Sequence, residues 1–343
     1  MNFLALASSW NPHCATCSQY LIDTTCSGIP SDFKKTCTEF TYRTCHDVCP
    51  RDSFDAHMAF ADFISKYEKN YSNYNVWKVA YKNFEANYDY VMAHMDIHST
   101  FSLGINEFSD TAHRRGHPFS PQRDCGQFKP TGKTVPTSVD HRTDGLVTPV
   151  KNQGNCGSCW AFSTTGSVEG LNALVSGDLV SLSEQQLVDC SRSEGDNGCY
   201  GGLMDYAFEY IIDNGICTEE DYPYIAHEKV CSNCTDAVYI KNCADVKPMS
   251  DEALQEAVAK QPVSVAIEAD SASFQSYSGG VYDSPECGTN LDHGVLVVGY
   301  TPDYWIVKNS WGESWGENGY INIARDGSSE GMCGILLQPS FPM

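Results

Sequence analysis

The sequence predicts an α+β fold, with a helical half, an antiparallel sheet half and a cleft between them. Two observations support this prediction. In residues 133–343, segments with apolar residues at helical spacing come first, and short apolar segments typical of strands follow. The preceding residues, 53–132, are rich in aromatic side chains and have helical spacing of their own. We therefore expect a smaller, mainly helical unit ahead of a larger two-lobed domain.

Residues 53–132 are expected to form two helices and a strand. Apolar residues at helical spacing predict one helix around residues 60–67 and a second from Val76 to Met92. The residues that share one face are Phe60, Phe63, Ile64 and Tyr67 in the first helix, and Val76, Ala80, Phe84, Tyr88 and Val91 in the second. Alternation from Phe101 to Phe108 predicts the strand. The stretch from Thr111 to Lys133, rich in Pro, Gly and basic residues, indicates an exposed linker with a candidate nicking site at Arg114-Arg115.

Residues 133–343 are expected to fold as helices first and strands afterwards. The predicted helices run from Cys159 to Val175, from Glu184 to Cys190, from Leu203 to Ile212, and from Asp251 to about Lys260. Ser183, with Gln186 three residues later, forms a capping box at the start of the second of these helices. The predicted strands span residues 263–268, 294–300, 304–308 and 319–324.

Charge and hydropathy exclude two classes of function. The chain has 343 residues, enough for about two domains at roughly 150 residues each. It carries 44 Asp and Glu against 22 Lys and Arg, a net charge of −22. Binding to nucleic acid or to anionic membranes needs basic patches. No apolar run reaches the ~18 residues that span a membrane. We therefore expect no nucleic-acid partner and no membrane association.

The 17 cysteines indicate an oxidising compartment, because reducing cytosol rarely leaves so many in one chain. Glycosylation sequons at Asn70 and Asn233 agree with this interpretation. The apolar stretch at the N-terminus, Phe3 to Ala7, is shorter than the ~7–15 residues of a signal peptide. A degenerate signal, a truncated signal and a start further upstream are all open. We expect a lysosomal, vacuolar or secreted protein.

Residues 1–52 form a separate cysteine-rich segment with six cysteines. Three disulfides are favoured there over zinc by the compartment argument. Cys14-x-x-Cys17 and Cys45-x-x-x-Cys49 keep zinc as the alternative. Targeting, partner binding and support of the following segment are its candidate roles.

The most informative stretch runs from Gln153 to Trp160 and reads QGNCGSCW. The pattern Cys-Gly-Ser-Cys-Trp is the signature of the papain and cathepsin nucleophile, with a His and an Asn ~130–150 residues downstream. His293 lies 134 residues after Cys159 (293 − 159), and Asn309 lies 150 residues after it (309 − 159). From about Gly104 to the C-terminus the sequence resembles the papain-like cysteine proteases, and within them the cathepsin L branch.

The chemistry of these residue types supports the resemblance. A thiol with its ordinary pKa of ~8.5 is mostly protonated at neutral pH, whereas the thiolate is the nucleophile. Cys159 begins a predicted helix, whose dipole favours negative charge, and an imidazolium at His293 would favour it further. His293 would deprotonate the thiol and then protonate the leaving amine. The resemblance implies that Asn309 orients the imidazole, that Trp311 shields it, and that Gln153 and the Cys159 N–H bind the oxyanion.

Each of these residues also has an ordinary structural interpretation. Cys159 could be half of a disulfide or a buried thiol, but its flanking residues favour a nucleophile. A lone histidine before an apolar strand is usually structural, but the spacing of His293 from Cys159 favours a catalytic base. Trp311 and Trp315 could be core residues, which is compatible with a role at the site.

The resemblance implies a papain-like two-lobed fold with a helical inhibitory propeptide. It also implies three disulfides, Cys156–Cys199, Cys190–Cys231 and Cys287–Cys333. Cys217, Cys234 and Cys243 are left over, and either a pair with one free thiol or a link to Cys125 is open. Zinc at Cys231-Ser232-Asn233-Cys234 lacks a second pair of ligands. We expect no metal and no cofactor.

The resemblance further implies an extended cleft for polypeptide substrates. Gly201 and Gly202 would let a substrate backbone lie close and add a strand. The other residues expected along the cleft or its second subsite are Leu203, Met204, Ala266, Leu291, Asp292, Trp311, Trp315 and Gln338. Gln338 replaces the apolar residue typical of cathepsin L, which predicts a bulky apolar P2 preference with some tolerance of polar or basic P2. The eight residues between Cys190 and Cys199 leave no room for the cleft-blocking loop of exopeptidase relatives.

Residues 53–132 resemble the inhibitory propeptide of this family. The propeptide motif Gly-x-Asn-x-Phe-x-Asp is matched at all four positions by residues 104–110. The longer helical motif is matched at Phe84 and Asn87, with Val91 for its Ile, whereas Val76 and Ala80 replace its Glu and Arg. We expect the propeptide to leave the cleft in acid, when Asp110 and its neighbours are protonated.

Cleavage is expected near Lys133 to Pro136, at the start of a catalytic domain of residues 133–343. His141 stands where the family usually has Trp, with no predicted effect on chemistry. The chain is then a monomeric, self-inhibited precursor of a cysteine endopeptidase that works through an acyl-enzyme intermediate. The alternatives are a catalytically silent papain-like binding or storage protein, and a cysteine-rich interaction module with a passenger fold. The first predicts a lost nucleophile or base, yet Cys159 and His293 are both present.

Overall fold

The structure is a computed structural model, which describes residues 51–94, 100–112, 116, 118–119, 125–232, 234 and 237–343. The cysteine-rich segment, Arg114-Arg115 and Asn233 lie outside the described residues. The chain divides into two compact units. Of the described residues, the smaller unit contains 51–94 and 104–112, and the larger contains 100–103 and those from 116 to 343.

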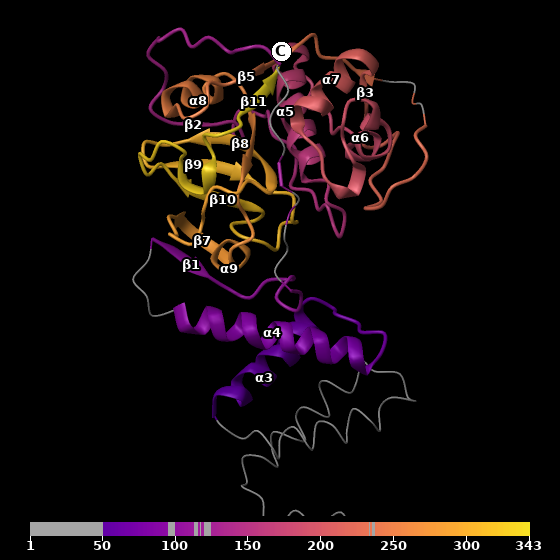
Figure 1. The fold of residues 1–343 in the computed structure, drawn as a ribbon, viewed down its shortest axis with the longest axis vertical. Helices are drawn as coiled ribbons and strands as arrows, with labels where there is room; N and C mark the ends of the chain where they lie inside the picture. Colours follow the sequence, from indigo (N-terminus) through magenta and orange to yellow (C-terminus); the bar gives the residue numbers. More distant parts are fainter. Residues whose placement is uncertain are drawn as a thin grey trace, which may run out of the picture. The chain divides into compact units, whose positions relative to one another are not determined.

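The smaller unit is built on two helices, α3 (Arg51–Lys66) and α4 (Tyr74–His94), which pack through aromatic side chains (Figure 1). Phe84 of α4 is fully buried, and its ring centre lies 5.0 Å from those of both Phe60 and Phe63. Trp77 and Tyr81 complete this cluster. Aromatic rings bury large apolar areas, so this cluster supplies the core of a very small unit.

One prediction for α4 is wrong, because Val76 is 44% exposed and Trp77 is buried in its place. A repeat of four residues overshoots the helical turn of 3.6 residues, so a face followed in steps of four drifts around the helix. The buried face is Trp77, Ala80, Tyr81, Phe84, Asn87 and Val91. The departure of Val76 from the propeptide motif therefore lies on the solvent side of the helix.

The propeptide motif forms a turn, and the predicted strand from Phe101 to Phe108 is correct only for β1 (Phe101–Leu103). The side chain of Asn106 accepts a hydrogen bond from the N–H of Phe108 at 3.0 Å, which bends the backbone out of the extended conformation. Asn87 of α4 donates to the carbonyl of Ser109 at 2.9 Å. The motif is thereby fixed to α4 within the smaller unit.

Asp110 closes this motif with an ion pair. Its carboxylate lies 3.0 Å from Nζ of Lys69 and accepts a hydrogen bond from the hydroxyl of Tyr71 at 2.8 Å. Burial and the neighbouring Asp110 together raise the pKa of Tyr71, so this hydroxyl stays a donor. Replacing this carboxylate with a neutral side chain would remove the ion pair and weaken the smaller unit.

We predict that Asp110→Asn destabilises the smaller unit by about 1.5–3 kcal/mol, the usual contribution of a hydrogen bond to a charged group. The precursor should then process itself at a higher pH than the parent. Thermal melting and the pH profile of self-processing measure both effects. Asp62→Asn, at an exposed position of α3, is the matched control, and equal behaviour of the two variants would contradict the prediction.

The larger unit places its main helices on one side of a sheet, as Figure 1 shows for α5, α6 and α7. The helices on that side are α5 (Cys159–Ser176), α6 (Glu184–Cys190) and α7 (Met204–Asn214). Two more helices of this unit, α8 (Asp251–Val258) and the short α9 (Ala272–Gln275), lie apart from these three (Figure 1). The hydroxyl of Ser183 accepts from the N–H of Gln186 at 3.0 Å, which confirms one half of the predicted capping box. The other half is wrong, because the N–H of Ser183 donates to the carbonyl of Cys217 and the side chain of Gln186 accepts from the N–H of Cys217. Trp160, Leu187 and Phe208 are fully buried in the core between the helices.

The sheet of the larger unit is mainly antiparallel and runs in the order β1-β7-β10-β9-β8-β6-β11-β5, with β2 paired to β8. Its strands are β1, β2 (Val139–Asp140), β5 (Cys243–Asp245), β6 (Val263–Ile267), β7 (Tyr277–Tyr282), β8 (His293–Tyr300), β9 (Tyr304–Lys308), β10 (Tyr320–Ala324) and β11 (Ser340–Pro342). A separate pair joins β3 (Ile216–Cys217) to β4 (Ala237–Val238). The predicted α+β architecture is confirmed, although α9 and the strands β2, β3, β4, β5, β7 and β11 were not predicted.

Helix α5 lies against β8, and this contact fixes the geometry of the site. The hydroxyl of Ser163 donates to the carbonyl of Val295 at 2.7 Å. A side chain at Gly294 would lie 3.2 Å from the Cα of Trp160, so a glycine lets β8 approach the beginning of α5. Cys159, the first residue of α5, and His293, the first residue of β8, are therefore brought to the same end of the contact between the helix and the strand.

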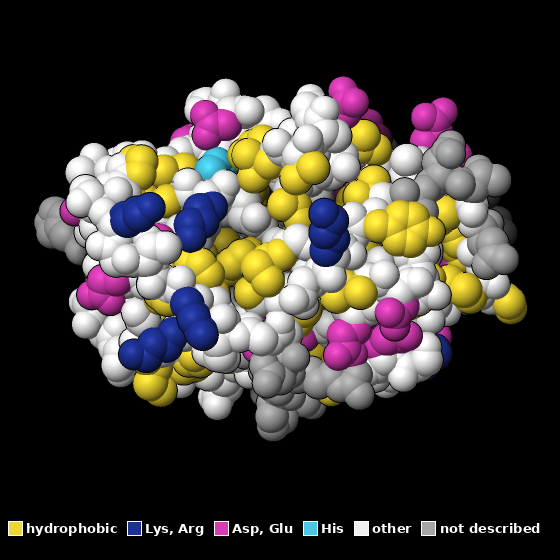
Figure 2. Space-filling view, turned by 90° about the horizontal axis from the view of Figure 1, so that it is seen from above, with side chains coloured by type: hydrophobic (Ala, Val, Ile, Leu, Met, Phe, Trp, Pro, Cys, Tyr) yellow, Lys and Arg dark blue, Asp and Glu magenta, His cyan; other side chains and the backbone are white. Residues whose placement is uncertain are grey.

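The surface carries both signs of charge. Figure 2 shows Lys and Arg side chains between exposed hydrophobic ones on one face, with acidic side chains near its margins. No helix in the described parts of the chain combines the length and the apolar character that a membrane span needs.

Candidate active site

Cys159 is the first residue of α5 and is 7% exposed. Among the described residues it is the free cysteine, since the others are in disulfides. The preceding Ser158 makes no capping hydrogen bond to the helix through its side chain. Its hydroxyl lies 2.6 Å from that of Tyr224 instead. The helix N-terminus therefore directs its backbone N–H groups to the thiol without a competing side-chain cap.

Burial raises the pKa of the Cys159 thiol to about 11. The backbone N–H groups of Gly294 and Trp160 lower it, while the charge of Asp292 raises it further. Burial of the side chain by itself favours the neutral thiol, because it penalises the charged form. The thiolate of a pair with the His293 imidazolium stays a prediction.

His293 is the first residue of β8 and is buried. Its Nε2 lies 2.8 Å from Oδ1 of Asn309, which follows β9. The N–H of Ser310 donates to the same Oδ1 at 2.8 Å, so this atom of the amide is the oxygen and not the nitrogen. Nε2 must therefore carry the proton in this pair. The ring of Trp311 lies 4.8 Å from the imidazole, centre to centre, and covers it.

Gln153 is held by several hydrogen bonds in the loop before Cys159. Its Oε1 accepts from the hydroxyl of Ser310 at 2.7 Å, and its Nε2 donates to the carbonyl of Cys156 at 2.9 Å. The hydroxyl of Tyr224 donates to the carbonyl of Gln153 at 2.8 Å. The amide orientation is thus fixed from both sides.

Sequence reasoning missed two residues that hold this loop, Ser310 and Tyr224. Ser310 adjoins the predicted Asn309, so its position was a usable signal. Tyr224 lies far from every motif in the sequence, and nothing in its surroundings there indicates the contact. It bridges the Gln153 carbonyl and the Ser158 hydroxyl, and its ring packs edge-on against Phe162 at 4.9 Å.

We predict that Tyr224→Phe lowers kcat about two- to tenfold with little change in KM, because one hydrogen bond contributes about 0.5–1.5 kcal/mol. The ring packing against Phe162 is retained, while the bridge that holds Gln153 and Ser158 is lost. Steady-state kinetics on a fluorogenic peptide measure the effect, and Tyr239→Phe at an exposed position is the control. A rise in KM alone would contradict a positioning role.

A cavity of about 450 Å³ in the larger unit brings half of the predicted site residues together. Those that line it are Gln153, Cys159, Gly201, Gly202, Asp292, His293 and Trp311. A second cavity of about 750 Å³ shares Asp292 and is lined by Leu291 and Gln338. Four further predicted residues, Leu203, Met204, Ala266 and Trp315, line neither cavity and are buried. Their contact with substrate stays a prediction.

Residues 116 and 119 of the linker also line both cavities. The N–H of Gly116 donates to the carboxylate of Asp292 at 3.3 Å, and the N–H of Phe119 donates to the carbonyl of Leu291 at 3.0 Å. A side chain at residue 116 would collide with the carbonyl oxygen of Asp292, at 1.8 Å. Phe119 packs against the apolar cluster that contains Met204 and Ala266. Gly116 and Phe119 therefore line the same cavity as Cys159.

The structure contains the three implied disulfides, Cys156–Cys199, Cys190–Cys231 and Cys287–Cys333. The two alternatives for the leftover cysteines are both partly correct, since Cys217 pairs with Cys234 and Cys125 pairs with Cys243. In the described part of the chain no thiol is left over except that of Cys159. The zinc site considered for Cys231 and Cys234 is excluded, because both cysteines are in disulfides.

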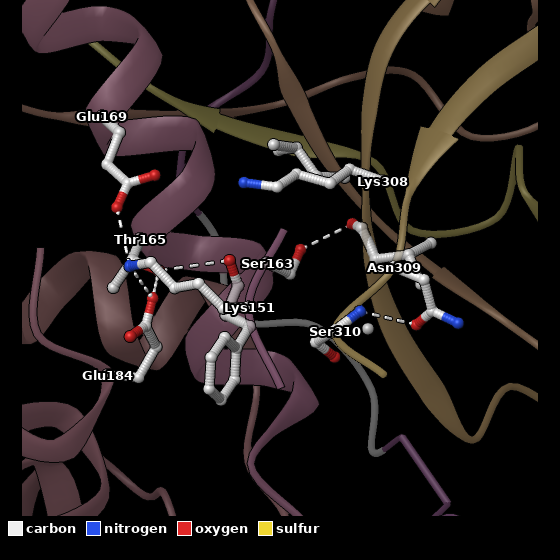
Figure 3. Close-up of a pocket in the computed structure, with 12 residues that line it drawn as sticks. Lys151, Ser163, Thr165, Glu169, Glu184, Lys308, Asn309 and Ser310 are labelled. Carbon is white, nitrogen blue, oxygen red and sulfur yellow. Dashed lines mark hydrogen bonds and ion pairs between the residues drawn. The ribbon is translucent and has the colours of Figure 1, made fainter. Parts of the chain in front are cut away.

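A buried group of charges lies behind the site, between α5 and the end of β9 (Figure 3). Nζ of Lys151 lies 2.9 Å from the carboxylate of Glu169 and 2.6 Å from that of Glu184. Lys308, next to Asn309, donates to the hydroxyl of Thr148 at 2.9 Å. We refer to Lys151, Glu169, Glu184 and Lys308 as the buried charge cluster. Its burial raises the pKa of Glu184 to about 7 and lowers that of Lys308 to about 8.

A buried cysteine at a helix N-terminus, beside a histidine oriented by an asparagine, defines a thiol hydrolase site on a two-lobed α+β fold. The sequence model of the papain family cysteine proteases matches residues 135–343, and that of the cathepsin propeptide inhibitor domain matches residues 60–114. The chain belongs to the papain family of cysteine proteases and carries the propeptide inhibitor domain of that family.

Named relatives agree with this membership. Cysteine protease XCP2 of Arabidopsis thaliana is 44% identical over 304 residues, which cover 82% of this chain and 85% of the relative. Cysteine proteinase RD21A of the same plant is 46% identical over 279 residues, which cover 76% of this chain and 60% of the relative. This chain thus spans less than two thirds of the length of RD21A.

Solved precursor structures have the same fold. The recombinant stem bromelain precursor superposes with a TM-score of 0.78 at 36% identity, covering 84% of this chain and 99% of that one. The proform of the ragweed pollen cysteine protease Amb a 11 gives 0.75 at 34% identity, covering 84% and 94%. The predicted papain-like precursor fold is confirmed.

Proposed function

We propose that this chain is the self-inhibited precursor of a cysteine endopeptidase that hydrolyses polypeptides through Cys159 and His293. One observation carries the proposal. A free cysteine at the N-terminus of α5 and a histidine hydrogen-bonded to Asn309 line the same cavity. Since the amide oxygen of Asn309 accepts a hydrogen bond from Nε2–H, the other ring nitrogen, Nδ1, is the one that exchanges a proton with the thiol.

The catalytic roles follow from this geometry. Nδ1 of His293 takes the proton of Cys159, the sulfur attacks the peptide carbonyl, and the imidazolium returns the proton to the leaving amine. Water then hydrolyses the thioester and restores the thiol. The backbone N–H of Cys159 and the side-chain amide of Gln153 donate to the oxyanion. Release of the linker would admit water to the site, reduce the burial of the thiol and lower its pKa toward the ordinary range.

The propeptide is proposed to act as an inhibitor within the chain. We assign the propeptide to residues 53–132 and the catalytic domain to residues 133–343, with the cysteine-rich segment at residues 1–52. The matches of the propeptide inhibitor domain to residues 60–114 and of the papain family to residues 135–343 support these limits. Gly116 and Phe119 beside Asp292 support a substrate-like path of the linker.

Endopeptidase action is favoured over exopeptidase action by the short connection between Cys190 and Cys199. It begins with the 3₁₀ turn Ser191–Ser193 and leads into a second one, Gly198–Tyr200. The disulfide Cys156–Cys199 ties its end to the loop before Cys159. A substrate can therefore extend past both ends of the cleft.

Substrate preference at P2 is proposed to be bulky and apolar. Phe119 packs against the apolar cluster beside the second cavity, and its aromatic ring indicates the kind of group that this pocket accepts. Gln338 lines the same cavity and is the polar group that would tolerate a basic P2 side chain.

We predict that Gln338→Ala lowers kcat/KM for an Arg-P2 substrate about two- to tenfold relative to a Phe-P2 substrate, the contribution of about one hydrogen bond. A pair of fluorogenic dipeptide substrates that differ only at P2 measures this ratio. Gln338→Glu is the informative companion, since a carboxylate should raise the Arg-P2 preference. An unchanged ratio in both variants would remove Gln338 from the specificity pocket.

The decisive test of the proposed function is acid activation followed by titration with an epoxysuccinyl thiol inhibitor. We expect stoichiometric labelling of Cys159, loss of peptidase activity in proportion to the label, and neither label nor activity in Cys159→Ala. A catalytically silent binding or storage protein would take up no label at any pH. Deleting residues 1–52 distinguishes a protease from a cysteine-rich interaction module with a passenger fold. The interaction module would lose its function, whereas the protease would keep its peptidase activity.

The cellular setting is part of the proposal. We propose a monomer in a vacuole, a lysosome or the extracellular space, and the five disulfides in the larger unit support an oxidising environment. Asn70 is exposed and can accept a glycan, whereas the sequon at Asn233 lies outside the described residues.

A further inference from the structure

One disulfide crosses the expected boundary between propeptide and catalytic domain. Cys125 lies in the linker, before the expected cleavage site at residues 133–136, and its sulfur is bonded to that of Cys243 at 2.06 Å. Cys243 begins β5, well inside the catalytic domain. The other disulfides described in the structure join residues that all lie after residue 133.

The residues after Cys125 pair with the end of β5 through an isolated parallel bridge. We call residues 125–132 the arm. The N–H of Asp245 donates to the carbonyl of Gly126 at 2.8 Å, and the N–H of Phe128 donates to the carbonyl of Asp245 at 2.8 Å. Gln127 forms a parallel bridge with Asp245. Because β5 ends the strand order of the main sheet, the arm covers an otherwise open edge.

Side chains of the arm also pack on the catalytic domain. Phe128 meets Phe341 of β11 edge-on, with the ring centres 5.3 Å apart. Nζ of Lys260, just past α8, lies 4.4 Å over the ring of Phe128. Figure 1 shows this part of the chain passing β5 and α8. The arm is thus bound by its backbone, by an aromatic contact and by a disulfide.

The end of the arm binds a carboxylate of α8. Glu256 accepts hydrogen bonds from the N–H and hydroxyl of Thr131, at 2.8 and 2.9 Å, and from the N–H of Gly132 at 3.1 Å. These donors lower the pKa of Glu256 from 4.5 to about 2. A carboxylate whose pKa is lowered in the folded chain stabilises the fold fully at any pH above its pKa in the unfolded chain. This stabilisation is lost only as the pH falls through the pKa of the folded chain. Mild acid that activates a precursor therefore leaves this contact in place.

We propose that the arm is a permanent part of the catalytic domain, and that the Cys125–Cys243 disulfide keeps the propeptide attached after a single cut at residues 133–136. Release of the propeptide then requires a cut on the N-terminal side of Cys125, or reduction of this disulfide by a dithiol. In the reduction, two thiols of the dithiol become its disulfide and Cys125 and Cys243 become thiols. This inference rests on the proposed inhibitory role of residues 53–132 only for its effect on activity.

The physical consequence of the tether is a high local concentration. A propeptide joined to its enzyme rebinds in an intramolecular step, with an effective concentration on the order of 1 mM for a short flexible connection. Dilution cannot lower that concentration. A tethered, singly cut enzyme should therefore stay inhibited when it is diluted, whereas an untethered one should gain activity.

The test of the tether uses the full chain with Cys159→Ala, which cannot process itself, and a recognition sequence for a site-specific protease inserted after Lys133. After that protease has cut, we expect one species of full mass in a denaturing, non-reducing gel and two fragments after reduction. The matched control, with Cys125→Ser and Cys243→Ser added, should give two fragments without reduction. Two fragments from the parent without reduction would overturn the proposal. Should the double variant fail to fold, peptic digestion of the parent decides instead, since a Cys125–Cys243 peptide must be found.

The effect on activity is tested with the same inserted recognition sequence in a protein that keeps Cys159. The site-specific protease cuts this protein at neutral pH. We expect less than a twofold change in activity per mole on 100-fold dilution of the parent, and at least a tenfold rise for the Cys125→Ser/Cys243→Ser variant. An equal rise in both would contradict retention of the propeptide. Because the gel experiment uses an inactive protein, failure of the tether and failure of the proposed protease activity give different results.

Discussion

His293→Ala is expected to lower kcat/KM for a peptide substrate by about 10²–10⁴-fold, the usual contribution of a general acid–base group. The imidazole lines the cavity with Cys159 and is held by Asn309 at 2.8 Å and covered by Trp311. Without it the thiol keeps the pKa that burial gives it and the leaving amine receives no proton. Rates should be measured at equal concentrations of protein released by an unrelated protease, since this variant cannot process itself.

The comparison with Asn309→Ala makes this prediction specific. That variant keeps the imidazole but removes the acceptor of its Nε2 proton, so we expect a smaller loss and a shifted pH profile. Val76→Ala, at an exposed position of the smaller unit, is a neutral control. Retention of most of the wild-type kcat/KM in His293→Ala would exclude the proposed pair as the catalytic machinery.

The elements predicted most closely have strong local signals. The predicted bounds of α6 and β9 agree with the structure. In α6 the Ser183 cap fixes the start, and in β9 five residues of mostly apolar character lie between turns. In contrast β7 was missed, because Gly279 and Gly280 interrupt its apolar pattern and its partner β10 pairs in parallel from far along the chain. Such pairing is a property of the sheet and not of the segment.

The site residues also differ in whether the sequence alone could predict them. Spacing placed Cys159, His293 and Asn309 in one site, because a motif with fixed intervals carries tertiary information. The raised pKa of the thiol could not be predicted, since its largest cause is burial of the side chain, which depends on tertiary packing. The Cys125–Cys243 pair joins residues 118 positions apart, and nothing local to either cysteine indicates its partner.

Lys151→Met is expected to destabilise the larger unit by about 3–5 kcal/mol, because removing one partner of a buried ion pair leaves charge without compensation. Nζ of Lys151 contacts both Glu169 and Glu184 and donates to the carbonyl of Leu182 at 3.0 Å, so its removal leaves two buried carboxyl groups unpaired (Figure 3). The loss should lower the melting temperature by on the order of 10 °C in a domain of this size. Thermal melting of the Cys159→Ala precursor measures it without self-digestion.

Lys308→Met is the matched control and should have a much smaller effect. Burial lowers the pKa of Lys308 to about 8, which means that its charged form is destabilised by loss of hydration. Its side chain donates its hydrogen bond to the neutral hydroxyl of Thr148. A folded-state pKa lowered from 10.5 means that the unfolded chain binds this proton more tightly, so stability should rise with pH between about 8 and 10.5 in the parent. That rise should be absent in Lys308→Met. Equal destabilisation by both substitutions would show that the buried charge cluster acts as one unit and that Lys151 has no special role in it.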